Sequence, residues 1–190
     1  TVLGLEWAGD VVEVGSAVTT HRVGERVMCS GKGAFAEYAI TDHGRATRIP
    51  SDHMSYEQAA TLPVALQTMH DAVVTNGRLQ AGDAVLIQGA STGVGLVGLQ
   101  IAKLMGAGLV IGTSTTAARR ERLHEFGAGL ALDSSDAEWP QQALAATAIL
   151  REHLPDLKVR FVNVVDLFRL VSSTELPHGS TEHEINGVFT

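Results

Sequence analysis

The stretch Ala84 to Met105, AVLIQGASTGVGLVGLQIAKLM, decides the fold, because an apolar run, a turn of small residues and an apolar helical pattern follow one another in it. Val85, Leu86 and Ile87 are aliphatic on both faces, as a strand buried in a parallel sheet requires. From Leu96 onward, apolar residues recur on more than one side of a helix, so we expect that helix to be largely buried. The stretch predicts a buried strand, a tight turn and a helix.

Glycines in the turn remove side chains where the backbone must bend sharply and approach something closely. They are Gly89, Gly93 and Gly95. The N-terminus of the helix would present free N–H groups and the positive end of its dipole, which together form an anion site. We expect a dinucleotide pyrophosphate there. The spacing is not G-x-G-x-x-G, and a plain strand-to-helix turn with glycines for packing stays open.

The residues that follow extend this unit. A second strand is expected over Leu109–Ser114, at the distance typical of a βαβ unit. A charged helix is predicted over Thr115–Phe126, with Gly127 as its C-cap, and a third short strand over Leu130–Asp133. Three parallel strands and two helices make one mononucleotide-binding half of an α/β fold.

The first 49 residues read as short strands separated by turns. Gly9–Val14 is a strand candidate, the turn Val23–Val27 leads into another, and Phe35–Ile40 alternates. These strands need more partners than the region supplies, and the chain begins at Thr1 without Met. We therefore expect a fragment whose upstream part is missing.

A helical stretch connects the two regions. Ser55 is a good N-cap, and Gln58 stands three residues later as in a capping box. The helical pattern is interrupted at Pro63 and continues to Val74, and the turn Gln80–Asp83 leads into the central strand.

Composition excludes several functions. A net charge of −7 and a pI near 5.5 argue against nucleic acid or an anionic membrane as the main partner. Cys29 is the single cysteine, which excludes an internal disulfide and a cysteine-rich zinc site, and we expect a packed thiol. Eight histidines without helical pairing indicate scattered surface residues rather than a metal site. No signal peptide or membrane-spanning run is apparent, so we expect a cytoplasmic protein.

Five motifs occur in the order of a known family. They are Gly9-x-Val11-x-x-Val14-Gly15, Val23-Gly24-Glu25-Arg26-Val27, Phe35-Ala36-Glu37-Tyr38, Ala59-Ala60-x-Leu62-Pro63 and Gly89-Ala90-Ser91-x-Gly93-Val94-Gly95-x-x-x-x-Gln100-x-Ala102-Lys103. Through them, residues 1 to about 145 resemble the medium-chain dehydrogenase/reductase superfamily, most closely its zinc-free quinone oxidoreductase branch. Zinc-dependent members carry a His where this chain has Leu5, which offers no lone pair to a metal.

The resemblance implies an α/β fold with a partial GroES-like β region over residues 1–50 and a partial Rossmann-like parallel sheet, an NADPH-binding half, over residues 51–145. Carried over by position, eight residues would hold the cofactor: Thr68, Ser91, Thr92, Gly93, Val94, Gly95, Ser114 and Arg119. Gly93 to Gly95 would lie under the pyrophosphate and Thr68 near the nicotinamide.

Selectivity for NADPH over NADH is expected from the end of the second strand. Ser114 and Arg119 fall where a 2′-phosphate would lie, and no acidic residue ends that strand to hold a free 2′-hydroxyl. Two structural alternatives stay open. Arg119 could lie on a solvated helix face, and the Thr68 hydroxyl could bond to the backbone of its own helix. No catalytic side chain is assigned.

A second resemblance covers residues 146–190. Leu150 to Leu167, LREHLPDLKVRFVNVVDL, with Pro177-His178-Gly179 and the final Phe189-Thr190, looks like the C-terminal domain of phosphoketolases. It predicts a helix ending before Pro155 and a buried strand over Val159–Val165, with loop after Leu170. None of the family's thiamine-diphosphate segments is present. The chain therefore reads as a junction of two partial genes near residues 145–149, in which this helix and strand can replace a missing Rossmann layer.

The expected function is that of an incomplete NADPH-dependent oxidoreductase of the quinone oxidoreductase type. It would transfer hydride to a small quinone or α,β-unsaturated carbonyl, without a metal. One alternative is a non-catalytic nucleotide-binding module or a non-functional fusion, and another, for the tail alone, is a phosphoketolase-related fragment. Whether the chain is active, and whether it forms a homodimer, stays open.

Overall fold

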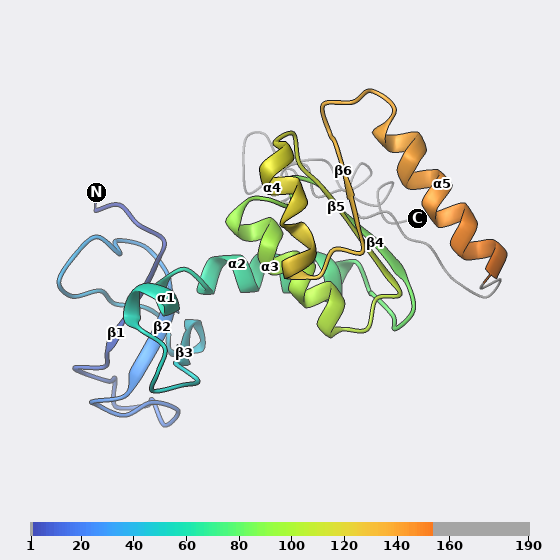
Figure 1. Ribbon diagram of the computed structural model, residues 1–190. Helices are drawn as coiled ribbons and strands as arrows, with labels where there is room; N and C mark the ends of the chain where they lie inside the picture. Colours follow the sequence, from blue (N-terminus) through green and yellow to red (C-terminus); the bar gives the residue numbers. More distant parts are fainter. Residues whose placement is uncertain (1, 154–190) are drawn as a thin grey trace, which may run out of the picture. The chain divides into compact units, whose positions relative to one another are not determined.

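The computed structural model describes residues 2–153. The chain divides into two compact units, Thr1–Thr68 and Met69–Thr190, with an antiparallel sheet in the first and a parallel sheet in the second (Figure 1). The predicted strand Val159–Val165 and the loop after Leu170 lie outside the described residues.

The first unit contains a three-stranded antiparallel sheet in the order β1-β2-β3. Its elements are β1 (Glu6–Asp10), β2 (Arg26–Ser30), η1 (His43–Arg45) and β3 (Ala46–Arg48). The central strand β2 pairs on both edges, with Cys29 opposite Trp7 on one side and Ala46 on the other. It is the most buried strand of this sheet because its neighbours shield both edges.

Two strand predictions in this unit are corrected. The first strand begins at Glu6 and ends at Asp10, so residues 11–14 of the predicted Gly9–Val14 strand lie outside it. The Phe35–Ile40 segment forms no strand, although its sequence alternates. Its apolar side chains stay exposed, Ile40 at 94%, because no described element covers either face of the segment.

The helical connection follows the prediction closely. Ser55 caps α1 (Tyr56–Ala60), and its capping box with Gln58 is present in both directions. α2 (Pro63–His70) begins at the proline, where a missing N–H costs nothing. A π-helical turn, η2 (Asp71–Asn76), continues the helix beyond the predicted end at Val74.

The second unit contains a parallel sheet in the order β4-β5-β6. Its elements are β4 (Ala84–Ile87), α3 (Gly93–Leu104), β5 (Leu109–Thr113), α4 (Ala117–Glu121), η3 (Leu123–Phe126), β6 (Leu130–Leu132) and α5 (Trp139–His153). Each strand is followed by a helical segment, so the predicted partial Rossmann-like sheet is confirmed.

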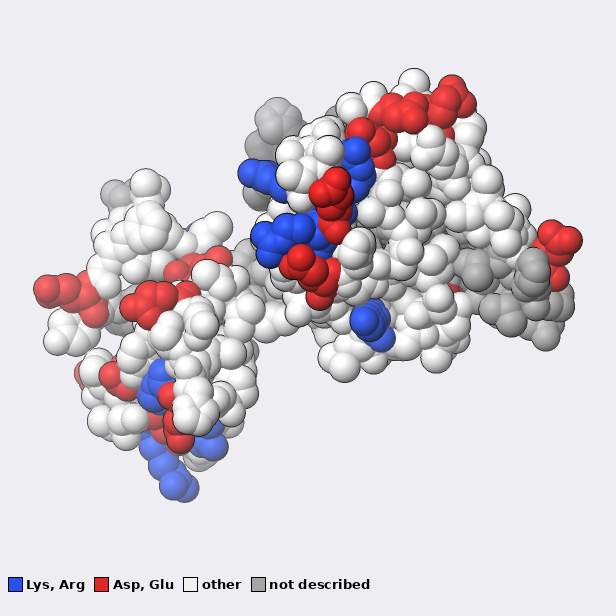
Figure 2. All heavy atoms as spheres, in the orientation of Figure 1, with Lys and Arg blue, Asp and Glu red and all other residues white. Residues whose placement is uncertain are grey.

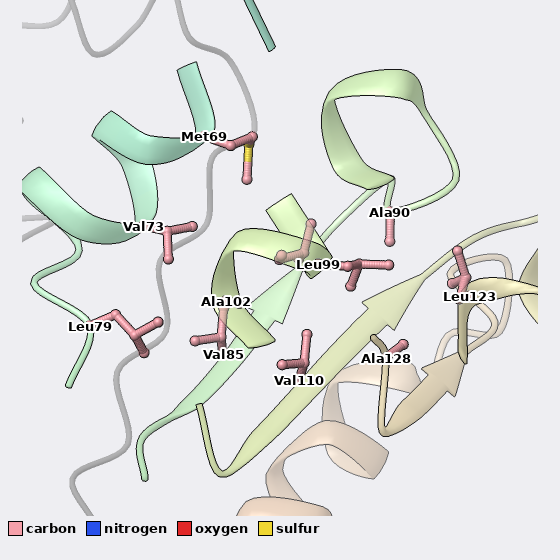
Figure 3. Close-up of a cluster of buried hydrophobic side chains, with 11 residues drawn as sticks. Met69, Val73, Leu79, Val85, Ala90, Leu99, Ala102, Val110, Leu123 and Ala128 are labelled. Atoms are coloured by element: carbon pink, nitrogen blue, oxygen red, sulfur yellow. The ribbon is translucent and has the colours of Figure 1, made fainter. Parts of the chain in front are cut away.

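Successive residues of this sheet enter two different cores, one on each face. Val85 of β4 and Val110 of β5 belong to the larger core, together with Leu99 of α3 (Figure 3). Segments η2, α3 and η3 cover this core. Leu86 and Ile111 belong to the smaller one, which α5 covers. Burial on both faces explains why β4 and β5 are continuous apolar runs rather than alternating ones.

Two helix predictions in this unit are corrected in part. The predicted helix Thr115–Phe126 is two short segments, α4 and η3: the α-helix ends at Glu121, and the 3-10 turn that follows buries Leu123. Gly127 ends η3 in the left-handed region, φ +110°, as its predicted C-cap role requires. α3 buries only one side, and Leu104 is 85% exposed because a helix in an outer layer has one face toward solvent.

Candidate functional site

The turn between β4 and α3 has the geometry of an anion site. Thr92 is the N-cap of α3: its hydroxyl accepts from the Gly95 N–H at 3.1 Å, and its carbonyl accepts from the Leu96 N–H at 2.9 Å. The N–H groups of Gly93 and Val94 have no partner among the residues that the structure describes. Two free donors therefore lie at the positive end of a twelve-residue helix.

The glycines of this turn have different physical roles. Gly89 adopts φ +60°, which favours glycine at the end of the strand. At Gly95 a β-carbon would lie 2.5 Å from the Gly89 carbonyl oxygen, so glycine lets α3 pack against the turn. At Gly93 a β-carbon would meet nothing within 4 Å. The first residue of the helix therefore has open space beside it, while the third, Gly95, is closely packed.

Hydrogen bonds hold the turn against the end of β5. The Ala90 N–H donates to the Thr113 carbonyl at 2.9 Å, and the Gly89 N–H donates to the Thr113 hydroxyl at 3.2 Å. The Ser91 and Ser114 hydroxyls are 2.9 Å apart and share a hydrogen bond. The carboxyl ends of β4 and β5 are thereby fixed relative to one another, at the edge where open α/β sheets bind ligands.

Arginines of α4 lie beside this edge, and Figure 2 shows basic side chains gathered over that helix with acidic ones among them. Arg120 donates to the Ser114 carbonyl at 2.9 Å and pairs with the Asp133 carboxylate at 3.0 Å. Hydrogen bonds from Ser135, together with Arg120, hold the pKa of the Asp133 carboxyl below its ordinary value. Arg119 is exposed, and no ion pair to it is found within residues 2–153.

The structure brings six of the eight predicted cofactor residues to one place. Ser91, Thr92, Gly93, Val94 and Gly95 form the turn, and Ser114 follows β5 beside it. Arg119 lies on α4, one residue from the arginine that bonds Ser114. Thr68 is the last residue of the first unit, so its place near the nicotinamide stays a prediction.

Arg120 and Asp133 were missed by the sequence analysis. Arg120 joins the ends of β5 and β6 through one guanidinium, which a run of three nearby arginines does not reveal. The acidic residue after the third strand was visible in the sequence. The partner of Asp133, Arg120, could be found only from the structure, because the two residues are thirteen positions apart in the sequence.

The remaining polar candidates have structural roles. The Glu6 carboxylate accepts from the Val64 N–H at 2.9 Å, at the start of α2. Cys29 is 3% exposed, and burial raises the pKa of its thiol, as a packed thiol requires. Within residues 2–153, no group of three His, Cys, Asp or Glu side chains could hold a metal ion. None of the helices in that range has both the length and the apolar character to span a bilayer.

Comparison with known families divides the chain into two parts. Residues 1–51 match the alcohol dehydrogenase GroES-like domain, and residues 126–190 match the XFP C-terminal domain. The second match begins before β6, earlier than the predicted junction near residue 146. It therefore includes β6 and α5 as well as the segment beyond them.

Individual relatives agree with this division. A highly reducing polyketide synthase from Didymella fabae is 36% identical over 126 residues, 66% of this chain and 7% of the synthase. A probable phosphoketolase from Synechococcus elongatus is 65% identical over 49 residues, 26% of this chain and 6% of the phosphoketolase. The Escherichia coli quinone oxidoreductase complexed with NADPH superposes with a TM-score of 0.65 and 29% identity, covering 83% of this chain and 46% of that one.

This chain spans only a small part of its curated relatives and less than half of that oxidoreductase. Its family matches nevertheless indicate two different kinds of segment, one at each end of the chain. The chain joins a segment of the medium-chain dehydrogenase/reductase type, with quinone oxidoreductases among its structural neighbours, to a segment of the phosphoketolase C-terminal type.

Proposed function

We propose that this chain binds NADPH at the α3 turn and belongs to an oxidoreductase that reduces a quinone or an α,β-unsaturated carbonyl. The observation that carries the proposal is the pair of N–H groups at Gly93 and Val94, which bond to no residue in the range 2–153, with open space at the Gly93 β-carbon position. A diphosphate needs both donors and close backbone approach, and this turn offers both.

The residues present fit a nicotinamide dinucleotide. The turn would hold the pyrophosphate, and Ser114 at the end of β5 would face the adenosine ribose. No carboxylate ends β5, since Thr113, Ser114 and Thr115 follow one another there. Arg119, exposed on α4, would pair with a 2′-phosphate, whereas Arg120 is already bonded to Asp133. This arrangement favours NADPH over NADH.

The contribution of the protein to this reaction is to position the cofactor relative to the acceptor. When bound, the cofactor supplies a hydride to an electron-poor acceptor. This chain's own residues bind the phosphates and orient the nucleotide along the carboxyl edge of the sheet. The NADPH complex of the E. coli enzyme and the reducing synthase relative support this class of reaction. A quinone and an enoyl carbonyl are both acceptors consistent with these two relatives.

Nucleotide titration of the full chain tests the proposal. Following nucleotide fluorescence, we expect saturable binding with preference for NADPH. Arg119→Ala should weaken NADPH binding roughly tenfold or more and leave NADH unchanged, because one charged hydrogen bond to the 2′-phosphate is lost.

Arg122→Ala is the matched control, because Arg122 already pairs with Glu125 at 3.0 Å in the same region. It should leave both affinities unchanged. Absence of binding by a folded chain would refute the proposal, and equal affinity for both nucleotides would refute its NADPH part. With binding established, NADPH oxidation with a small quinone and with an enoyl thioester identifies the acceptor.

A further inference from the structure

One arginine of α4 connects the ends of two strands. The Arg120 guanidinium donates to the Ser114 carbonyl, after β5, at 2.9 Å and pairs with the Asp133 carboxylate, after β6, at 3.0 Å. The Arg120 side chain is 20% exposed, whereas that of Arg122, which pairs with Glu125, is 68% exposed. Because water screens exposed ion pairs, the contact of Arg120 with Asp133 is the better protected of the two.

Ser114 extends these contacts to the α3 turn. It is buried, and its hydroxyl lies 2.9 Å from the Ser91 hydroxyl and accepts from the Thr116 N–H at 3.3 Å. Its N–H donates to the Leu132 carbonyl at 3.1 Å. The carbonyl, the hydroxyl and the N–H of Ser114 are therefore all bonded, and such a network holds a buried residue in one position.

Ser91 stands directly before the residues that present the donors of the turn. Thr92, the N-cap of α3, follows it, and the Gly93 and Val94 N–H groups come next. Because the turn contains several glycines, backbone preferences alone do not fix its direction. The hydrogen bond of Ser91 to Ser114 is one of the contacts that do. A series of contacts, which we call the Arg120 bridge, thus runs from Asp133 through Arg120 and Ser114 to Ser91.

We propose that Arg120 and Asp133 are positioning residues for the nucleotide, a role that rests on the proposed function. Through the Arg120 bridge they hold the Gly93 and Val94 N–H groups in the direction that the pyrophosphate requires. Arg120 stays bonded to Asp133 and leaves the 2′-phosphate to Arg119. Because the pyrophosphate is common to NADPH and NADH, both nucleotides should depend equally on the bridge.

Nucleotide titration of the full chain, well below its melting temperature, distinguishes positioning from direct contact. Arg120→Ala should weaken binding of NADPH and of NADH by the same factor, roughly fivefold, because the donors shared by both lose their fixed direction. Arg119→Ala, by contrast, weakens NADPH binding alone. Loss of NADPH affinity alone in Arg120→Ala would indicate contact with the 2′-phosphate and overturn the proposal, as would two unchanged affinities.

A double-mutant cycle tests the route of the effect. Ser91→Ala removes the last hydroxyl of the Arg120 bridge, so most of the fivefold effect of Arg120→Ala should disappear in the Ser91→Ala background. A residue that only stabilises the fold would show no such coupling. Arg122→Ala is the control and should neither change the affinities nor couple to Ser91. Effects of Arg120→Ala and Ser91→Ala that simply multiply would overturn the proposal.

Asp133→Asn tests the carboxylate with a smaller change. The asparagine keeps a side-chain oxygen that accepts from Arg120 but has no charge, and charged hydrogen bonds are the stronger ones. Both nucleotides should therefore bind more weakly by an equal factor that is smaller than in Arg120→Ala. Tighter NADPH binding would show that a released Arg120 reaches the 2′-phosphate, and would contradict the proposal.

The Arg120 bridge is also tested without nucleotide, by NMR on the isotope-labelled full chain. Arg120→Ala should shift the amide resonances of Gly93 and Val94, whereas Arg122→Ala should leave them in place. Slow amide exchange at Ile111, which is buried in β5, shows that the parallel sheet is folded. Unshifted Gly93 and Val94 resonances in folded Arg120→Ala would overturn the proposal.

The outcomes separate the proposal from the proposed function. If Arg120→Ala loses Ile111 protection, Asp133→Asn takes its place in the titration and in the NMR comparison. If the unmodified chain binds neither nucleotide while Arg120→Ala still shifts the Gly93 and Val94 resonances, the proposed function fails and the connection of Arg120 to the turn stands. If both nucleotides bind and the resonances do not shift, the positioning role alone fails.

Discussion

The two sheets of this chain differ in how many faces they bury. Every residue of β4 is buried, because alternate side chains enter cores on opposite faces. In the antiparallel sheet only β2 is buried along most of its length, and β1 and β3 are partly exposed. Exposed large apolar side chains also gather in the first unit, with Phe35, Tyr38 and Ile40 at 74% exposure or more. The parallel unit thus contains most of its own core, and we expect it to be the more stable of the two.

The largest effect is expected at the centre of the parallel unit. Leu99 is fully buried between α3 and the sheet, so Leu99→Ala should lower the free energy of unfolding of that unit by about 3 kcal/mol. Urea unfolding followed by amide exchange at Ile111 measures it. Reactivity of the Cys29 thiol, which reports on the first unit, should not change.

Phe35→Ala in the first unit is the control, since that side chain is 78% exposed. It should change stability by no more than about 0.5 kcal/mol. A cost equal to that of Leu99→Ala would show that the exposed apolar residues are packed in solution, and the contrast between the sheets would fail.

A smaller effect is expected where α3 meets the turn. Gly95→Ala should cost about 2 kcal/mol, because its β-carbon would lie 2.5 Å from a backbone oxygen. Gly93→Ala is the matched variant, with nothing within 4 Å of its β-carbon, and should leave thermal stability nearly unchanged. It should still weaken NADPH binding, because the methyl group takes up ligand space. Equal thermal destabilisation by both variants would contradict the assignment of open space to Gly93.

The smallest effect is expected from the pair that joins β5 to β6. Since the folded-state pKa of Asp133 is lowered, its contribution to stability is present above the ordinary aspartate pKa of about 4 and is lost as the pH falls through the lowered value. Asp133→Asn should therefore make the fall in melting temperature between about pH 6 and about pH 3 shallower.

Glu125→Gln is the comparison variant, because the hydrogen bond from Arg122, three residues away, also lowers the pKa of the Glu125 carboxyl. It should likewise make the acid transition shallower, because the linkage depends on the lowered pKa and not on which elements the pair joins. An acid transition unchanged by Asp133→Asn would show that the pair adds nothing to stability.

Particular elements show where sequence reasoning succeeded and where it failed. The Ser55 capping box and the strand before Gly89 were predicted correctly, because each depends on residues close in sequence. The Phe35–Ile40 strand was wrong, because alternation becomes a strand only where another element buries one face. The single helix predicted over Thr115–Phe126 was wrong in its continuity, since an α-helix and a 3-10 turn that buries Leu123 share that range.

By itself the sequence determined the local geometry of this protein: the buried strand, the glycine turn and the capped helix that begins after Ser55. These follow from backbone preferences and apolar spacing within short windows. The tertiary structure alone decided that Arg120 joins Ser114 to Asp133, that α5 covers the face opposite α3, and that β4 pairs with β5 in parallel. Each of these depends on contacts between residues far apart in the chain, which only the packing of the sheet brings together.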